Sequence, residues 1–292
     1  MNTATRYFSI CIFLCALFTT EAWAQGAGLR VADSLFRAGD YPAASIEYER
    51  FLYHYPTDPA FPRVKLQKAL CYRHVGNYES ALRELAEISI LRTDEALLSR
   101  IYYERSLNHY LLGQDHEALL NLSRIQLGAG DDSLKQAVWP LTILASNRLR
   151  NFDTAHVMLG ELVRLSTLPA SRKHALQLKV DSLYAAKHLP RAFSPQRARH
   201  LSQFVPGAGQ AWSGHPGEGA VSLLLNAALL GFGVHQLWFS YYWTAYIAAF
   251  TVFNKTYFGG MERAEFLAGA ETLNRMAEFN EDVLEVLREV CP

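Results

Sequence analysis

The sequence Gly39-Asp40-Tyr41-Pro42-Ala43-Ala44 is the first of four similar segments in the chain. The other three are Gly76-Asn77-Tyr78…Ala81, Gly113…Ala118 and Asn151-Phe152…Ala155. The last residue of each segment is an alanine, and it recurs at an interval of 37 residues, at positions 44, 81, 118 and 155. A fixed period of this size is typical of stacked helical repeats, in which each repeat contributes one supersecondary unit.

Each of these segments is expected to lie where one short helix ends and the next begins. Gly39 is expected to end the first helix, because glycine accepts the left-handed conformation that a helix C-terminus often needs. Ala44, Tyr48 and Phe51 then share one face of a second helix at the spacing i, i+4, i+7. The small alanine suits a position where two helices approach closely. In the fourth unit Arg150 replaces the glycine.

The order of glycine, tyrosine, alanine, aromatic residue and proline in these units resembles the tetratricopeptide repeat (TPR). Residues 39–56 are most similar to TPR proteins of the Gram-negative envelope, and the resemblance covers roughly residues 29–187. The usual TPR unit has about 34 residues, so we expect each inter-repeat loop to be about three residues longer here. The resemblance implies a TPR-like α-solenoid, with a helix over 171–187 covering the apolar edge of the fourth repeat.

The N-terminus has the features of a secretory signal peptide. A positive charge precedes a nearly continuous apolar run over residues 7–18, and residues 22–24 (Ala-Trp-Ala) fit the small-x-small cleavage pattern. We therefore expect residues 1–24 to be removed, so that the mature chain begins at Gln25. The alternative is an uncleaved membrane anchor, for which the apolar run is short.

The C-terminal third contains a long uncharged stretch. No Asp, Glu, Lys or Arg occurs from Gly219 to Asn254, although 19% of the whole chain is charged. About 20 helical residues cross a bilayer, so we expect two short spans near 219–235 and 241–257. The aromatic-rich segment between them suits a membrane–water interface. A hairpin that only partly enters the bilayer and a buried soluble hairpin are the alternatives.

A glycine-rich motif precedes this stretch: residues 205–226 read Val-Pro-Gly-Ala-Gly-Gln-Ala-Trp-Ser-Gly-His-Pro-Gly-Glu-Gly-Ala-Val-Ser-Leu-Leu-Leu-Asn. This motif resembles that of a bacterial family of small membrane domains, which has the pattern Pro-Gly-x-Gly-Gln-x-(Tyr/Trp)-x-Gly-x-x-x-x-Gly before a two-helix hairpin. The resemblance covers roughly residues 194–275 and implies a membrane location without a known chemistry. The matching positions are Pro206, Gly207, Gly209, Gln210, Trp212, Gly214, Gly219 and Asn226, and a closing element is found at Asn254, Tyr257, Gly259 and Gly260.

The residue types in this motif have a direct physical meaning. Glycines permit close backbone packing and turns of positive φ. Gln210 and Asn226 are expected to hydrogen-bond across the hairpin, as amides between membrane helices do. The motif therefore either packs the hairpin tightly or forms a re-entrant loop that recognises lipid or a partner. A phosphate-binding loop is disfavoured, because no Gly-Lys-Ser/Thr ending is present.

The TPR resemblance also implies a peptide-binding groove formed by the first helix of each unit. Arginine suits bidentate recognition of carboxylates, and tyrosine adds rigid contact area, so we hypothesise an acidic or C-terminal-carboxylate ligand segment. The alternative is a solvated face on which the arginines pair with nearby Glu and Asp. The expected groove residues are Phe36, Arg37, Arg63, Arg73, His74, Arg100, Tyr103, Tyr110, Asn147 and Arg148.

Catalytic and metal-binding patterns are missing from the sequence. There is no His-Glu-x-x-His, no Gly-x-Ser-x-Gly and no Cys-x-x-Cys, so we expect no enzyme activity, catalytic residue, cofactor or metal. The 28 acidic and 28 basic residues give no net field that would attract nucleic acid. The mature chain keeps only Cys71 and Cys291, which do not suggest a disulfide framework.

Together these patterns predict an all-α protein in which a TPR-like α-solenoid precedes a short transmembrane or re-entrant helical hairpin. We expect a membrane-anchored adaptor or assembly factor that binds a protein partner in the bacterial envelope, with its repeats in the periplasm. An accessory subunit of a membrane enzyme or transporter is the alternative, and direct action on lipid or cell wall is poorly supported. The predicted parts are a signal peptide (1–24), a solenoid with capping helix (25–189), a linker and amphipathic segment (190–205), a membrane hairpin (206–260) and an amphipathic C-terminal helix (261–292).

Overall fold

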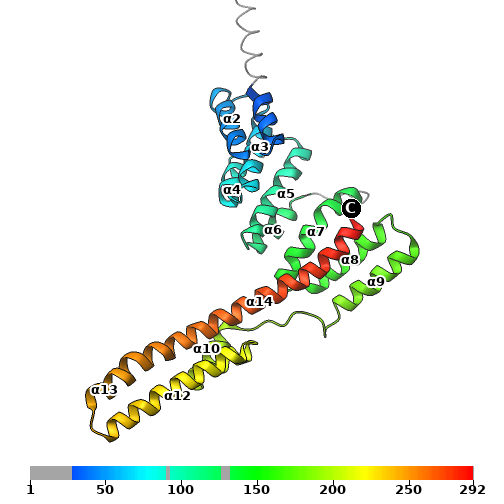
Figure 1. The fold of residues 1–292 in the computed structure, drawn as a ribbon. Helices are drawn as coiled ribbons and strands as arrows, with labels where there is room; N and C mark the ends of the chain where they lie inside the picture. Colours follow the sequence, from blue (N-terminus) through cyan, green and yellow to red (C-terminus); the bar gives the residue numbers. More distant parts are fainter. Residues whose placement is uncertain (1–27, 90–92, 126–131, 292) are drawn as a thin grey trace, which may run out of the picture. The chain divides into compact units, whose positions relative to one another are not determined.

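The computed structural model describes residues 28–89, 93–125 and 132–291, with the side chains of 132–135 and 248–250 excepted. Helices and their connections make up these ranges, and no strand occurs within them (Figure 1). The predicted all-α class is therefore confirmed for this part of the chain. The expected signal peptide lies outside it. The chain divides into two compact units, Met1–Met158 and Leu159–Pro292.

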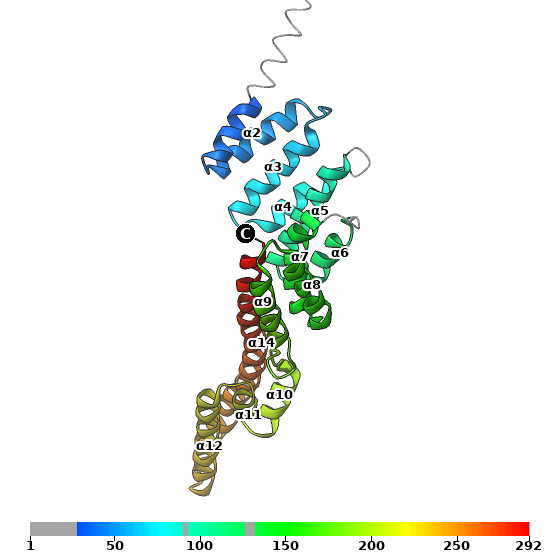
Figure 2. The same cartoon turned by 90° about the vertical axis from the view of Figure 1, so that its right-hand side faces the viewer.

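The first unit is a succession of short helices, each packed against the next from α2 to α7 (Figure 2). A helix over residues 28–37 comes first. It is followed by α2 (Tyr41–His54), α3 (Phe61–His74), α4 (Tyr78–Ala86), α5 (Glu95–Leu111), α6 (Asp115–Leu122), α7 (Asp132–Arg148) and α8 (Phe152–Leu165), which continues into the second unit.

The 37-residue period of the sequence is repeated in the backbone. Gly39, Gly76 and Gly113 have φ angles of +82°, +80° and +77°, and Arg150 adopts the same left-handed conformation at +63°. Each turn carries the same pair of hydrogen bonds: the Asp40 amide, for example, donates to the Leu35 carbonyl at 3.0 Å. This is the Schellman motif, which satisfies the last carbonyls of a helix.

The periodic alanines lie where neighbouring helices meet. Ala44, Ala81, Ala118 and Ala155 are each 0% exposed, as their predicted role in close helix packing requires. Two of the second helices also begin with side-chain caps, because Asp40 accepts from the Ala43 amide and Asn77 from the Ser80 amide. Such caps satisfy amides that lack a partner in the first helical turn.

The second unit contains a long helical hairpin. After α9 (Ala170–Leu183), α10 (Pro195–Phe204) and the short α11 (Ala208–Trp212), the outward arm is α12 (Pro216–Trp238). A left-handed turn at Ser240 (φ +62°) reverses the chain. The return arm runs without a break through α13 (Tyr242–Tyr246), the π-helical η2 (Ile247–Phe253) and α14 (Asn254–Val290). Figure 1 shows α12 lying alongside this return arm.

No helix boundary separates the predicted hairpin (206–260) from the predicted C-terminal helix (261–292). One helix, α14, passes through residue 260 and ends at Val290. The change from uncharged to charged residues does not coincide with a break in the helix. Gly259 and Gly260 also lie within it. The C-terminal half of α14 lies against α9, where the rings of Tyr184 and Phe279 meet edge to face with centroids 5.3 Å apart.

Candidate functional site

The glycines of the motif bring α11 and the start of α12 into backbone contact. A Cβ atom on Gly207 would lie 2.0 Å from the carbonyl oxygen of Gly219, and one on Gly219 would lie 2.5 Å from that of Gly207. Gly207 also has a φ of +90°, which favours glycine for a second reason. No side chain fits at either position without moving a helix.

A second close contact joins α11 to α10. A Cβ on Gly209 would lie 2.0 Å from the Ala198 carbonyl oxygen. Gly214 ends α11 in a left-handed turn with φ +98°. Gly260 has the Ser222 hydroxyl close by, whereas a Cβ on Gly259 would meet nothing within 4 Å. Four of the motif glycines are therefore required by packing or by φ, and Gly259 faces open space.

A buried amide connects three helices of the hairpin base. The Gln210 side chain is 2% exposed. Its Nε2 donates to the Gly260 carbonyl on α14 at 2.9 Å, and its Oε1 accepts from the Ser202 hydroxyl on α10 at 3.0 Å. Ser202 in turn accepts from the Gly209 amide at 3.0 Å. Every polar atom of the Gln210 amide thus has a partner on another helix or in its network.

Asn226 makes the second polar link, directly between α12 and α14. Its Oδ1 accepts from the Thr256 hydroxyl at 3.1 Å, while its Nδ2 donates to the Ser222 carbonyl at 2.8 Å. The expectation that Gln210 and Asn226 hydrogen-bond across the hairpin is confirmed. Their partners Ser202 and Thr256 were not predicted, because single hydroxyl residues outside the glycine pattern carry no local signal.

The aromatic motif residues brace the same base. The Trp212 ring packs edge to face on Phe193, with centroids 5.2 Å apart, and Arg197 lies over its face. The Tyr257 hydroxyl on α14 donates to the Gln203 carbonyl of α10. Pro206 lies in the turn between α10 and α11, and Asn254 is the first residue of α14. The motif is therefore a single structural unit assembled from α10, α11, α12 and α14.

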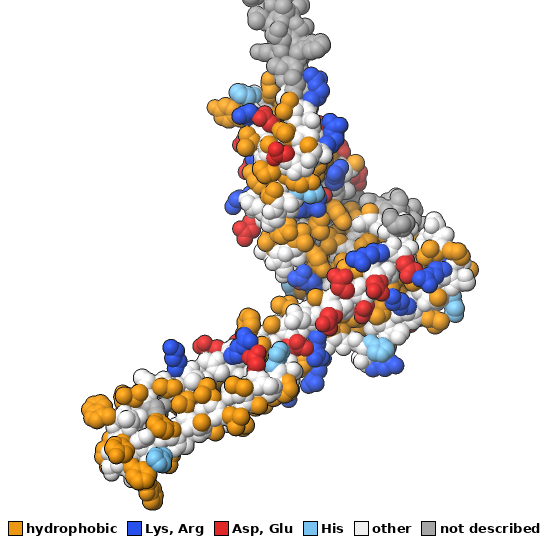
Figure 3. All heavy atoms as spheres, in the orientation of Figure 1, with side chains coloured by type: hydrophobic (Ala, Val, Ile, Leu, Met, Phe, Trp, Pro, Cys, Tyr) orange, Lys and Arg blue, Asp and Glu red, His pale blue; other side chains and the backbone are white. Residues whose placement is uncertain are grey.

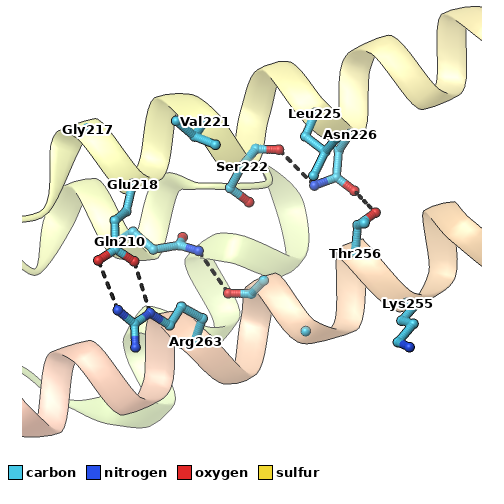
Figure 4. Close-up of a pocket in the computed structure, with 12 residues that line it drawn as sticks. Gln210, Gly217, Glu218, Val221, Ser222, Leu225, Asn226, Lys255, Thr256 and Arg263 are labelled. Carbon is cyan, nitrogen blue, oxygen red and sulfur yellow. Dashed lines mark hydrogen bonds and ion pairs between the residues drawn. The ribbon is translucent and has the colours of Figure 1, made fainter.

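A cleft of about 520 Å³ opens between α12 and α14 beside this base (Figure 4). One end is closed by a bidentate ion pair, in which Arg263 reaches the two carboxylate oxygens of Glu218 at 2.9 and 3.0 Å. At the other end lie the linked Asn226 and Thr256, and Lys255 lies next to them on α14 with its side chain extending away from α12. The remaining lining combines small, polar and aliphatic residues: Gln210, Gly217, Val221, Ser222, Leu225, Gly259 and Gly260.

The outward arm of the hairpin exposes apolar side chains instead of burying them. Within the most apolar 18-residue window of α12 only 11% is buried. The aromatic residues at the tip are also exposed, with Trp238 at 84% and Trp243 at 81%. Figure 3 shows hydrophobic side chains covering this arm. Among the described residues α12 is the one helix long and apolar enough to cross a membrane, whereas two such spans were expected.

Two arginines of the expected groove are already paired within the first unit. Arg73 lies 3.2 Å from the Glu104 carboxylate, and Arg148 lies 3.1 Å from that of Asp115. Burial raises the pKa of both carboxyl groups, and the neighbouring guanidinium in each case opposes that rise. Arg148 also donates to the Tyr110 carbonyl and lies over the Tyr110 ring. These contacts favour the alternative in which arginines pair with nearby acids.

The other expected groove residues differ in their burial and contacts. Asn147 is fully buried, so it belongs to helix packing and cannot line a groove. Phe36 and His74 pack on Tyr41, whose ring stacks on His74 with centroids 4.3 Å apart. Burial lowers the pKa of His74. Tyr103 is half-buried, and Arg37, Arg63 and Arg100 remain exposed.

A buried lysine network in the first unit was missed by the sequence analysis. Lys68 on α3 pairs with Glu49 on α2 and with Glu84 on α4, the latter at 2.6 Å. Lys65 pairs with Glu84 at 2.8 Å and with Glu87 at 2.6 Å. The network connects three consecutive helices. No local pattern predicts it, because its partners lie 16 to 22 residues apart in the sequence.

Within the ranges that the structure describes, no cluster of three or more His, Cys, Asp or Glu residues could hold a metal ion. No protein-family model matches the chain, and neither a curated protein nor a solved structure is significantly similar to it. The functional conclusion therefore rests on the geometry of the two units alone.

Proposed function

We propose that this protein is a membrane-anchored adaptor of the bacterial envelope, in which a TPR-like α-solenoid binds a protein partner. The hairpin formed by α12 and the return arm anchors the protein in the bilayer, and residues 1–24 direct its export. The observation that carries the anchoring is the exposed apolar surface of α12, because water solvates such a contiguous surface poorly.

The length of the hairpin suits a bilayer. The uncharged part of α12 from Gly219 to Trp238 has 20 residues, or about 30 Å at 1.5 Å per residue, which equals the usual hydrocarbon thickness. Helical arms satisfy their own backbone groups, as lipid requires. The exposed aromatic tip matches the residues that gather at a membrane–water interface.

The adaptor role is supported by the regular first unit. Left-handed turns and fully buried alanines recur with the same period over four helix pairs, as in stacked repeats whose helices present an extended binding surface. Three arginines of the proposed groove are exposed, so an acidic segment can reach them: Arg37, Arg63 and Arg100. Arg73 and Arg148 are excluded as simple probes, because reversing their charge would leave a buried carboxylate beside a second negative charge.

Membrane anchoring is tested with two charges on the outward face of α12. We expect the full chain with Leu224→Glu and Leu230→Glu to lose flotation with vesicles, because charges in hydrocarbon are expensive. Leu224 is 69% exposed, so no core packing is lost. The matched control is Val157→Glu in the first unit, where the valine is 71% exposed. Unchanged flotation of a folded double variant would exclude α12 as the anchor.

Partner binding is tested by site-specific photo-cross-linking in cells. A photoreactive residue in place of Arg63 or Arg100 should cross-link one protein partner, whereas the same residue in place of the exposed Ile46 on α2 should not. Equal labelling from all three positions, or none from the arginine positions, would contradict a groove on the first helices.

A second candidate function is that of an accessory subunit acting through the hairpin. The observation that favours it is the cleft between α12 and α14, where polar and apolar side chains meet at the level at which α12 enters the proposed bilayer. If the partner complex keeps its activity after the repeats are deleted, this function is favoured over the adaptor.

A further inference from the structure

Lys255 occupies an unusual place for a cation. It follows the uncharged stretch directly, and the Asn226–Thr256 hydrogen bond places it level with Asn226, seven residues past Gly219 on the outward arm. Seven helical residues correspond to about 10 Å. If the uncharged part of α12 crosses the hydrocarbon, Lys255 therefore lies below the boundary at which that arm enters, where an unpaired charge is costly.

No described acidic residue pairs with Lys255. The carboxylate that lines the cleft belongs to Glu218. Both of its oxygens already accept hydrogen bonds from Arg263. The ion pair and the free lysine together give the cleft one net positive charge. A lysine at such a depth extends its flexible stem toward the interface, where an anion can pair with its ammonium group.

The cleft next to Lys255 has the room and the polar groups to hold that anion. The Ser222 residue lines it, with its hydroxyl close to Gly260 of α14. At Gly259 a Cβ would meet nothing within 4 Å, so this stretch of α14 leaves space free. Val221 and Leu225 on the facing stretch of α12 are exposed and apolar, as the start of an acyl chain would require.

We propose that the cleft between α12 and α14 binds one anionic phospholipid, with its phosphate at Lys255 and Ser222 and its acyl chains along α12. From Lys255 to Arg263 the cleft rises by about 12 Å over eight helical residues. The ion pair lies beside Gly219, where the outward arm enters the hydrocarbon, so the phosphate lies just below the ion pair, where the lysine stem reaches it when turned toward the interface. The headgroup then extends past the ion pair into the polar interfacial layer of about 5–8 Å. The inference rests on the proposed anchoring and specifies the lipid that the anchor selects.

The test measures lipid binding to the full mature chain in detergent by native mass spectrometry. Phosphatidylglycerol is the probe, phosphatidylcholine the zwitterionic comparison, and inorganic phosphate the soluble competitor. We expect wild-type protein to retain one phosphatidylglycerol in preference to phosphatidylcholine. Lys255→Gln should weaken this binding at least about tenfold, as loss of a charge-assisted hydrogen bond does. Inorganic phosphate should not displace the lipid, because it lacks the acyl chains.

Two matched controls separate a built site from general attraction between a lysine and anionic lipid. Gly259→Leu fills the cleft and keeps Lys255, and it should weaken binding to a similar extent. Gly231→Leu adds the same side chain to α12, where a Cβ also meets nothing within 4 Å, and should leave binding unchanged. Lys187→Gln removes a positive charge elsewhere in the second unit and should also have no effect.

The outcomes distinguish this inference from the proposed function. Lys255→Gln and Gly259→Leu should still float with vesicles, because the apolar surface of α12 is intact. If wild-type protein floats but shows no preference for phosphatidylglycerol, or if Gly259→Leu binds it as well as wild type, the lipid site is refuted and the anchor stands. If inorganic phosphate displaces the lipid, the cleft binds phosphate and not a lipid. Wild-type protein that does not float refutes the anchor.

Discussion

Replacing Gly219 by alanine tests whether the glycine motif exists to bring two helices into backbone contact. The added Cβ would lie 2.5 Å from the Gly207 carbonyl oxygen and 3.1 Å from the Ala211 amide nitrogen. Real Cβ atoms essentially never approach within 3.0 Å, so α11 and α12 must separate by at least about 0.5 Å, the difference between 3.0 and 2.5 Å. Both contacting atoms belong to the backbone, so no side chain can rotate away.

Two opposing effects set the size of the change. Alanine favours a helix over glycine by about 1 kcal/mol, which would stabilise α12. Overpacking of a close contact costs about 1–3 kcal/mol, and displacement of α11 also weakens the Gln210 hydrogen bond to α14, worth about 1 kcal/mol. The net expectation is a loss of about 1–3 kcal/mol. At about 2–4 °C per kcal/mol, that lowers Tm by roughly 2–12 °C.

The assay is thermal unfolding of the full chain in detergent, followed by circular dichroism. Gly231→Ala is the matched control, since it lies on the same helix and its Cβ would meet nothing within 4 Å. We expect the control to have an unchanged or slightly higher Tm. If Gly219→Ala unfolds at the same temperature as Gly231→Ala, the close contact does not stabilise the hairpin and the reasoning is wrong.

Three further predictions concern the first unit and the N-terminus. Arg150→Gly should raise the free energy of unfolding by about 0.5–1 kcal/mol, because it relieves a left-handed non-glycine residue, and Gly76→Ala should lower it by a similar amount; denaturant titration measures both. Burial raises the pKa of Glu84, but hydrogen bonds from Lys65 and Lys68 outweigh it and hold the pKa below its ordinary value of 4.5. The stability from ionised Glu84 is therefore present above that value and is lost as pH falls through the lower folded-state pKa, so Glu84→Gln should flatten the acid side of the stability profile; a profile as steep as that of wild type would contradict this assignment. N-terminal sequencing of membrane-derived protein should begin at Gln25, and an intact Met1 would exclude signal cleavage.

The sequence alone determined the features that depend on a few neighbouring residues. Gly39 and its counterparts predicted where helices end, because the left-handed conformation at a C-terminus is a local backbone preference. Ala44 and its counterparts predicted close helix packing, because a repeated small residue suits a position where two helices approach closely. The amides of Gln210 and Asn226 were expected to bond across the hairpin, since a polar side chain in an apolar segment needs a partner.

Only the tertiary structure decided which residues meet over long separations in the chain. Arg73 was expected to face a ligand, yet α5 places Glu104 beside it. Lys68 joins three helices, and Gln210 reaches a carbonyl 50 residues away. Such pairs depend on the crossing geometry and register of whole helices, which no short stretch of sequence encodes. The continuity of α14 was missed for a related reason: a change in side-chain charge alters what surrounds a helix, while its backbone hydrogen bonds continue unchanged.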